Sequence, residues 1–334
     1  MPSSTVIKTC TPIVSRCVQT GTHFRLLAPP QQRRCFSILA KSKDEIATIR
    51  EHLRNFGSTE DSVSLQLASE LEHSSSLSKL GSTTALITLK NPASRNALTG
   101  KMMAELADTV DILESNESFQ KSLTAVIVRG DAGFFCAGAD IGVAKDHLLS
   151  SEGGRLMSTV MIDTLTRFRH LPFVTVAAIE GMAVGGGAEL TTAMDYRIIN
   201  KEAKLRFVHA HMGVSPGWGG ATRLVRLIGR NRALELLGTA QPSDSDQSLK
   251  LGLVDEIVSS DSTMDDTLVT FLDRFIHAHP GVLHAAKEVV AGVEDAASFE
   301  EAVANEHEVF LKMWGGEANL AALTKAKTKK PKKE

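Results

Sequence analysis

Two glycine-containing turns carry the most distinctive chemistry in this sequence. The first, residues 134–140, reads Phe-Phe-Cys-Ala-Gly-Ala-Asp and follows an apolar segment. The second, residues 180–190, contains Gly185, Gly186 and Gly187 and precedes a segment with helical periodicity. Glycine lets a ligand approach the main chain closely, and the first turn of a helix has unpaired N–H groups. Two such groups that point at one oxygen form an oxyanion hole.

Other interpretations of these glycines are open. Either turn alone is more typical of an ordinary glycine turn. Three consecutive glycines also occur in phosphate-binding loops, but no Lys-Ser or Lys-Thr pair follows them here. The spacing G-x-G-x-x-G is absent as well, which disfavours nucleoside triphosphates and dinucleotides as ligands.

The segments around the two turns predict an α/β domain. Apolar stretches predict buried strands, and segments with a period of 3.6 residues predict helices. The expected strands are residues 63–68, at a sheet edge, and 85–89, 123–129, 174–179 and 196–199, with a Ser-rich loop at 73–83. The expected helices are residues 46–56, 102–113 and 188–194, and then 222–228, 232–237, 267–277, 283–289 and 299–314. Strands that alternate with helices favour a largely buried sheet, here followed by a helical region.

The first residues have the composition of a mitochondrial transit peptide. Residues 1–43 contain no Asp or Glu but several Arg, Lys, Ser and Thr. The segment Arg34-Cys35-Phe36-Ser37 resembles a mitochondrial processing site, with cleavage after Phe36. A weakly basic terminus without a targeting role is the alternative. Cleavage would leave Cys136 as the one cysteine, because the other three of the four precede Ser37, and an intrachain disulfide would be excluded.

Composition narrows the functional classes further. The chain has 334 residues, 43% of them hydrophobic, and a formal net charge of −2. This length is enough for a large core, and the balanced charge gives no general attraction to nucleic acid or membranes. No apolar run approaches the ~20 residues of a membrane-spanning helix. We expect no metal and no separate cofactor, because His209 and His211 alone are too sparse to be a metal site.

More of the chain resembles one family. The two turns, in this order, are similar to those of the crotonase, or enoyl-CoA hydratase/isomerase, superfamily. Residues 91–98, 213–224 and 251–257 also resemble family segments, and the resemblance covers about residues 80–316. It implies a crotonase-like (ClpP/crotonase) spiral of ββα units with an appended C-terminal helical region. We therefore expect an N-terminal helix and edge strand at 37–76, a core at 77–262, C-terminal helices at 263–320 and a disordered basic tail at 321–334.

The resemblance assigns roles residue by residue. The backbone N–H groups of Ala139 and Gly186 would hold the thioester oxygen of an acyl-coenzyme A. These hydrogen bonds strengthen when charge develops on that oxygen, and this difference is what accelerates the reaction. The residues that would contact the coenzyme A thioester are Arg95, Asn96, Ala97, Ala137, Gly138, Asp140, Gly185 and Trp218.

One position departs from the hydratase pattern. Hydratases of the family use two carboxylates to activate one water molecule. The first corresponds to Glu189, but the second position is occupied by His209. A histidine there removes half of the carboxylate pair. A packed histidine without a chemical role is the alternative, although this position is catalytic in relatives.

The sequence around His209 resembles a decarboxylating branch of the family. Enzymes of that branch remove the free carboxylate of ethylmalonyl-CoA and, less well, of methylmalonyl-CoA. Decarboxylation needs an enolate sink and a proton donor, and either His209 or Glu189 could donate. The function expected is therefore decarboxylation of a branched malonyl-CoA. The alternatives are an enoyl-CoA hydratase or isomerase, and an RNA-binding protein that uses the six lysines of residues 325–333.

The resemblance also implies partners and a location. The acyl-CoA substrate would be the principal ligand, and the family forms homotrimers or dimers of trimers (homohexamers). We expect neither a membrane nor a nucleic acid as partner. The transit peptide predicts the mitochondrial matrix, with the cytosol as the alternative because the best-known similar decarboxylase is cytosolic.

Overall fold

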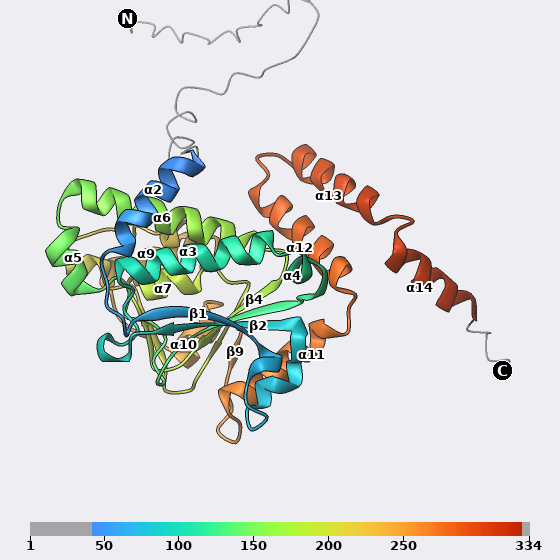
Figure 1. The fold of residues 1–334 in the computed structure, drawn as a ribbon, viewed down its shortest axis with the longest axis horizontal. Helices are drawn as coiled ribbons and strands as arrows, with labels where there is room; N and C mark the ends of the chain where they lie inside the picture. Colours follow the sequence, from blue (N-terminus) through green and yellow to red (C-terminus); the bar gives the residue numbers. More distant parts are fainter. Residues whose placement is uncertain (1–41, 329–334) are drawn as a thin grey trace, which may run out of the picture. The chain divides into compact units, whose positions relative to one another are not determined.

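The computed structural model describes residues 42–328, and its main element is a six-stranded sheet with the order β1-β2-β3-β4-β6-β9 (Figure 1). The edge strand β1 pairs antiparallel with β2, and every later neighbour pairs in parallel. These strands are β1 (Ser62–Leu67), β2 (Thr84–Lys90), β3 (Ala125–Gly130), β4 (Val174–Ile179), β6 (Tyr196–Ile199) and β9 (Glu256–Ile257).

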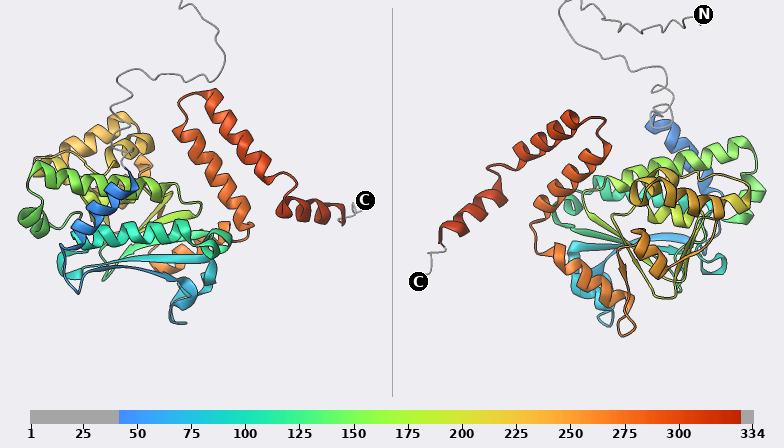
Figure 2. Two further views of the ribbon diagram at one scale, coloured as in Figure 1. Left: turned by 45° about the horizontal axis from the view of Figure 1, so that its top comes forward. Right: turned by 180° about the vertical axis from the view of Figure 1, so that it is seen from behind.

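Helices cover both faces of this sheet. Alternate residues of β2 point to opposite sides, so Ile87 and Leu89 join one apolar cluster while Leu86 joins another. The first cluster packs under α3 (Gly100–Ser115) and α6 (Ser151–Arg169), and the second packs under α11 (Met264–Ile276). Figure 2 shows these layers from two further directions. Because both faces are buried, the inner strands are continuous apolar runs rather than alternating ones.

The remaining elements complete the fold. The other α-helices are α2 (Lys43–Arg54), α4 (Glu117–Ser122), α5 (Ile141–His147), α7 (Gly186–Thr191), α8 (Gly220–Ile228), α9 (Arg230–Thr239), α10 (Ser245–Leu251), α12 (Pro280–Asp295), α13 (Phe299–Met313) and α14 (Glu317–Thr328). The 3₁₀ helices are η1 (Ala68–Glu70), η2 (Ser76–Thr83), η3 (Pro92–Ser94) and η4 (Val208–Met212).

A second, three-stranded sheet lies next to the functional turns. It has the order β5-β7-β8 and consists of β5 (Met182–Val184), β7 (Lys204–Arg206) and β8 (Ser243–Asp244). Strand β5 leads directly into α7, and β7 leads into η4. Their parallel pairing therefore places the start of α7 beside the start of η4. The sequence analysis missed these strands because three residues are too few to show a periodicity.

The segment before the sheet is fastened through Asp61. This carboxylate is 3% exposed and accepts hydrogen bonds from Thr99 and from the amide of Ser58, the latter over 2.7 Å. Thr99 is the N-cap of α3 and its side chain accepts a hydrogen bond from the amide of Met102. The network thus ties the chain that follows α2 to the beginning of α3, close to the loop at residues 91–98.

Helix α12 is attached to the domain by polar contacts along its length. His284 Nε2 lies 2.7 Å from the carbonyl oxygen of Leu123. Lys287 donates hydrogen bonds to the carbonyl oxygen of Phe173 and, over 2.7 Å, to the carboxylate of Asp195. Near the end of the helix, Glu294 and Asp295 form ion pairs with Arg169, and Asp295 also pairs with His170 and Arg226.

Two expectations for local structure were wrong. The segment 321–334 was expected to be disordered throughout, but α14 continues to Thr328, since Ala, Leu and Lys are strong helix formers. The Ser-rich segment 73–83 is not a plain loop, because η2 spans residues 76–83 and buries Leu77 and Leu80. The predicted transit peptide, residues 1–36, lies outside the described residues, and so does the end of the lysine-rich tail. The crotonase-like α/β fold itself is confirmed.

Candidate functional site

The first turn presents the amide of Ala139 on one side of a short β-bridge. Leu98 donates a hydrogen bond to the carbonyl oxygen of Gly138 and accepts one from the amide of Asp140, over 2.7 and 2.9 Å. In a parallel bridge of this kind, the polar groups of the residue between the two bonded ones point away from the partner. Within residues 42–328 the Ala139 amide donates to no other group.

The second turn presents the amide of Gly186 at the start of a helix. The amide of Gly185 donates to the carbonyl oxygen of Arg206 over 2.8 Å, which continues the β5–β7 pairing. Gly185 has a φ of 54°, a conformation that favours glycine. Gly186 then begins α7, so its N–H group has no acceptor inside the helix, and it donates to none elsewhere in residues 42–328.

The two turns pack directly against one another. A Cβ atom on Gly187 would lie 2.1 Å from the carbonyl oxygen of Cys136, and one on Gly138 would lie 3.0 Å from the nitrogen of Gly186. Side chains at these positions would separate the turns. The glycines are therefore required for the close approach of the Ala139 and Gly186 segments, which is the arrangement that an oxyanion hole needs.

Glu189 and His209 meet beside this arrangement. Glu189 lies on α7, three residues after Gly186, and its side chain is 1% exposed. His209 lies on η4, and its Nε2 atom is 2.9 Å from Glu189 Oε1. An ionised carboxylate only accepts hydrogen bonds, so Nε2 carries the hydrogen. The Nδ1 atom of His209 is buried and has no hydrogen-bond partner within residues 42–328.

The Glu189 carboxylate also holds the turn that precedes α8. Its Oε1 accepts a hydrogen bond from the amide of Gly217 over 3.2 Å. Its Oε2 accepts hydrogen bonds from the amides of Trp218 and Gly220, both over 2.9 Å. The Trp218 side chain then lies against Gly186, where a Cβ atom would fall 2.5 Å from carbons of the indole ring.

Arg223 is a site residue to which the sequence analysis gave no role. Its guanidinium donates to Thr192 Oγ1 over 3.0 Å and to the carbonyl oxygens of Trp218 and Glu189 over 2.9 and 3.3 Å. Burial lowers the pKa of Arg223 to about 10, against the attraction of Glu189. The group is therefore charged at neutral pH. A charged residue on an otherwise apolar helical face was the signal that could have indicated it.

The loop expected to contact coenzyme A has two different surfaces. Arg95 is exposed, and its guanidinium lies 5.9 Å from the centre of the Phe134 ring. Asn96 is fully buried, and its side chain bonds main-chain groups of Asn91, Asp131 and Phe134. Both have a positive φ. Asn96 therefore shapes the loop through its side chain, while Arg95 has its charge at the surface.

The other expected binding residues are distributed around the same turns. Ala137 donates its amide hydrogen to the carbonyl oxygen of Arg95 over 3.0 Å, which joins the loop to the first turn. Ala97 is buried next to this junction. Asp140 is the N-cap of α5, and its side chain accepts a hydrogen bond from the amide of Val143. The fold thus brings together Arg95, Asn96, Ala97, Ala137, Gly138, Ala139, Asp140, Gly185, Gly186, Glu189, His209 and Trp218.

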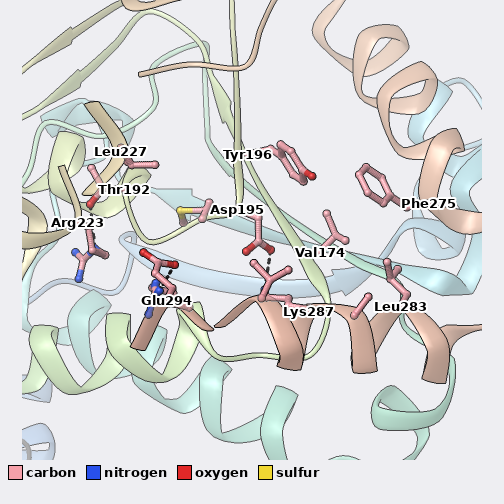
Figure 3. Close-up of a pocket in the computed structure, with 14 residues that line it drawn as sticks. Val174, Thr192, Asp195, Tyr196, Arg223, Leu227, Phe275, Leu283, Lys287 and Glu294 are labelled. Carbon is pink, nitrogen blue, oxygen red and sulfur yellow. Dashed lines mark hydrogen bonds and ion pairs between the residues drawn. The ribbon is translucent and has the colours of Figure 1, made fainter. Parts of the chain in front are cut away.

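A separate pocket of about 370 Å³ lies between α12 and the end of the sheet (Figure 3). Tyr196, Phe275 and Leu283 line its apolar part, and the ion pair of Asp195 with Lys287 lines its polar part. It shares Arg223 with the site described above but contains neither the two turns nor His209. Burial lowers the pKa of Lys287, although Asp195 opposes this effect. The pocket is therefore distinct from the candidate site.

The described part of the chain gives no sign of a metal centre or a membrane span. No three His, Cys, Asp or Glu side chains within it are grouped so that they could hold a metal ion. No helix within it combines the length and the apolar character that crossing a bilayer requires.

Comparisons with known proteins agree with this geometry. The chain matches the family described as enoyl-CoA hydratase/isomerase over residues 79–320. It is 42% identical to ethylmalonyl-CoA decarboxylase of Homo sapiens over 242 residues, which are 72% of this chain and 77% of that protein. The corresponding protein of Mus musculus is 40% identical over 242 residues, 72% of this chain and 73% of that one.

A solved structure supports the fold. The enoyl-CoA hydratase of Bacillus anthracis superposes with a TM-score of 0.69 at 24% identity, over 79% of this chain and 95% of that chain. The matched family region begins before β2 and includes every residue of the candidate site. The chain therefore belongs to the enoyl-CoA hydratase/isomerase family, within the crotonase superfamily of enzymes.

Proposed function

We propose that this enzyme decarboxylates a branched malonyl-CoA thioester, ethylmalonyl-CoA first and methylmalonyl-CoA second. The observation that carries the proposal is the buried contact between His209 and Glu189, because it places one imidazole where a hydratase needs a second carboxylate. The relatives at about 40% identity are named ethylmalonyl-CoA decarboxylase, which supports the same reaction.

The reaction would proceed through an enolate. The bond between the α-carbon and the free carboxylate breaks, CO₂ leaves, and its electron pair moves into the thioester as an enolate. The amides of Ala139 and Gly186 would stabilise the resulting oxyanion, where losing one donor costs about 3 kcal/mol. A proton then adds to the α-carbon to give the shortened acyl-CoA. Neither an oxidant nor a reductant is needed.

The close packing of the turns supports this role. The carbonyl oxygen of Cys136 occupies the position that a side chain of Gly187 would fill. The two amides are therefore held in place by the fold before the substrate arrives. Dipoles oriented in advance do not have to reorganise as charge develops, and this is the main source of electrostatic catalysis.

A substrate panel tests the proposal. The purified chain is incubated with ethylmalonyl-CoA, methylmalonyl-CoA and crotonyl-CoA, and CO₂ release and product mass are measured. We expect CO₂ and butyryl-CoA from ethylmalonyl-CoA with the highest kcat/KM. Faster hydration of crotonyl-CoA than CO₂ release from ethylmalonyl-CoA would instead assign the chain to the hydratases.

We also propose that the protein assembles into a trimer or a dimer of trimers. Large apolar side chains on and beside α13 are exposed in the single chain, and a second copy could cover them. They are Phe299, Phe310, Leu311 and Trp314. Sedimentation equilibrium tests this, and a monomer at micromolar concentration would contradict it.

A further inference from the structure

The Glu189 carboxylate has no remaining capacity for hydrogen bonds. Its two oxygens accept from His209 Nε2 and from the amides of Gly217, Trp218 and Gly220. A carboxylate has about four acceptor positions, and all four are used. A proton on either oxygen would face an N–H group that already points at it. In this state, therefore, Glu189 neither holds a transferable proton nor offers a free lone pair.

The turn around Glu189 is shaped to fit it. Gly219 has a φ of 78°, which brings the following amide towards the carboxylate. A Cβ atom on Gly220 would lie 2.4 Å from the Cγ of Glu189. The turn can approach the carboxylate only because position 220 lacks a side chain. This close fit also sets the position of Trp218, whose ring packs on Gly186.

His209 is organised in the opposite way. One ring nitrogen is bonded to Glu189, whereas Nδ1 is buried without a partner in residues 42–328. A buried polar atom without a hydrogen bond is costly, and such atoms often mark a place where a ligand binds. The pairing of β5 with β7 puts η4 beside Gly185, where a Cβ atom would lie 3.3 Å from the Val208 side chain. His209 is thus adjacent to the expected oxyanion hole.

From these contacts we infer that Glu189 is a positioning residue and that His209 is the residue that delivers the proton, an inference that rests on the proposed decarboxylation. Glu189 keeps a hydrogen on His209 Nε2 in every protonation state. Nδ1 is then the nitrogen that takes up a proton from solvent and gives it to the α-carbon of the enolate. A fixed carboxylate that selects the tautomer of a working histidine is a general device of acid–base sites.

The inference makes a prediction that does not need substrate. The chain is labelled with ¹⁵N-histidine, and the ring nitrogens are followed by NMR from acidic to alkaline pH. His209→Gln identifies the resonances of His209 by their loss. We expect His209 to lose its proton from Nδ1 and to retain the hydrogen on Nε2. Loss of the Nε2 hydrogen in the wild type would overturn the inference, whatever reaction the enzyme catalyses.

Glu189→Gln should reverse this pattern. The glutamine oxygen can still accept from Trp218 and Gly220, which leaves its NH₂ group facing His209. That group donates, so Nε2 becomes the bare nitrogen and Nδ1 keeps the hydrogen. Glu202→Gln, at an exposed glutamate, is the matched control and should leave the ring of His209 unchanged. If Glu189→Gln does not fold, the wild-type titration alone decides the question.

Turnover gives an independent test. His209→Gln should lower kcat for ethylmalonyl-CoA on the order of 10²-fold, the usual effect of losing a general acid. His209→Gln combined with Glu189→Gln should be no slower than the slower single variant, because both changes remove one unit. Losses that multiply would mean that Glu189 acts on the substrate directly and would overturn the inference. His211→Gln, at an exposed histidine of the same turn, is the control and should keep the wild-type rate.

The two proposals fail differently. If the wild type releases no CO₂ from any malonyl-CoA, decarboxylation is wrong, but the NMR titration still reports whether Glu189 fixes the tautomer of His209. If CO₂ is released and the titration shows the other tautomer, decarboxylation stands and the division of roles is wrong.

Discussion

The indole ring of Trp218 lies directly over the backbone of Gly186. A Cβ atom built on Gly186 would be 2.5 Å from two carbons of the ring, well inside van der Waals contact. Any substitution at residue 186 therefore displaces the indole, whatever happens to the amide that is expected to bind the thioester oxygen. The steric and the electrostatic roles of this position must be separated by experiment.

Replacing Trp218 with alanine makes that separation possible. In the Trp218→Ala background, Gly186→Ala no longer meets the ring and keeps its N–H group. Gly186→Pro in the same background lacks the N–H group, although proline is well tolerated at the first position of a helix. We expect the proline variant to have a kcat about 10²-fold or more below that of the alanine variant. Equal rates in two folded variants would show that the Gly186 amide does not hold the oxyanion.

His209→Glu should move the enzyme towards hydration. The variant restores two carboxylates, the arrangement with which hydratases of the family hold water, so the ratio of crotonyl-CoA hydration to CO₂ release should rise. Because His209 contacts Glu189 over 2.9 Å, the new carboxylate faces a like charge and the melting temperature should fall. The check is kcat/KM for both substrates with wild type, His209→Ala and His209→Glu. An unchanged ratio would mean that position 209 does not decide the reaction.

Stability should depend on Asp61 in a defined pH window. Burial acts to raise the pKa of Asp61, but hydrogen bonds from Thr99 and Ser58 and the charge of Lys101 outweigh it, so the pKa is lowered. The carboxylate therefore stabilises the fold fully above its unfolded pKa of about 3.9. That contribution is lost as the pH falls through the lower, folded pKa.

Asp61→Asn measures this contribution. At pH 7 we expect a loss of about 2 kcal/mol in the free energy of unfolding, the usual cost of removing a buried, charged hydrogen-bond partner. The difference from wild type should shrink below pH ~4. Asp146→Asn, at an exposed position of α5, is the control and should be neutral. Urea titrations at pH 7 and pH 3.5 provide the comparison, and a pH-independent difference would contradict the assignment.

Cys136 should be chemically inert in the folded enzyme. Burial raises the pKa of its thiol to about 12, although the amide of Gly138 opposes this effect. Since the thiolate is the reactive form, alkylating reagents need the unfolded chain. Peptide mapping after iodoacetamide treatment should find residue 136 unmodified in buffer and modified in urea. Rapid modification in buffer would show that the first turn opens.

We propose that residues 1–36 direct the protein to mitochondria and are removed. The acid-free composition of this segment and the sequence Arg-Cys-Phe at residues 34–36 motivate the proposal. N-terminal sequencing of protein isolated from cells should begin at or near Ser37. An intact Met1 or Pro2 terminus on cytosolic protein would contradict it.

The sequence predicted the fold well where periodicity and motif coincide. The buried strands β3 and β4 are continuous apolar runs, and α3 repeats its apolar residues every three to four positions, so each could be located without a structure. The strands of the second sheet could not be located, because β5 and β7 contain three residues each. Their pairing is a tertiary property that places η4 beside α7.

The site shows the same division. The types and spacing of Gly186, Glu189 and His209 indicated that they act together. The sequence could not show that Glu189 is saturated with hydrogen bonds, because three of its four donors are main-chain amides whose direction depends on the turn before α8. It also gave no means of pairing Arg223 with the carbonyl oxygens that it binds.

The carbonyl oxygen of Cys136 fills the space beside Gly187 and makes the two turns a single rigid unit. The ordering of both amides is completed when the protein folds and is not repeated in each catalytic cycle. The chemical step should consequently have an activation entropy near zero, with the barrier almost wholly enthalpic. A substituent at position 187 would change that temperature dependence before it changed the affinity for substrate, since the affinity comes largely from the distant coenzyme A moiety.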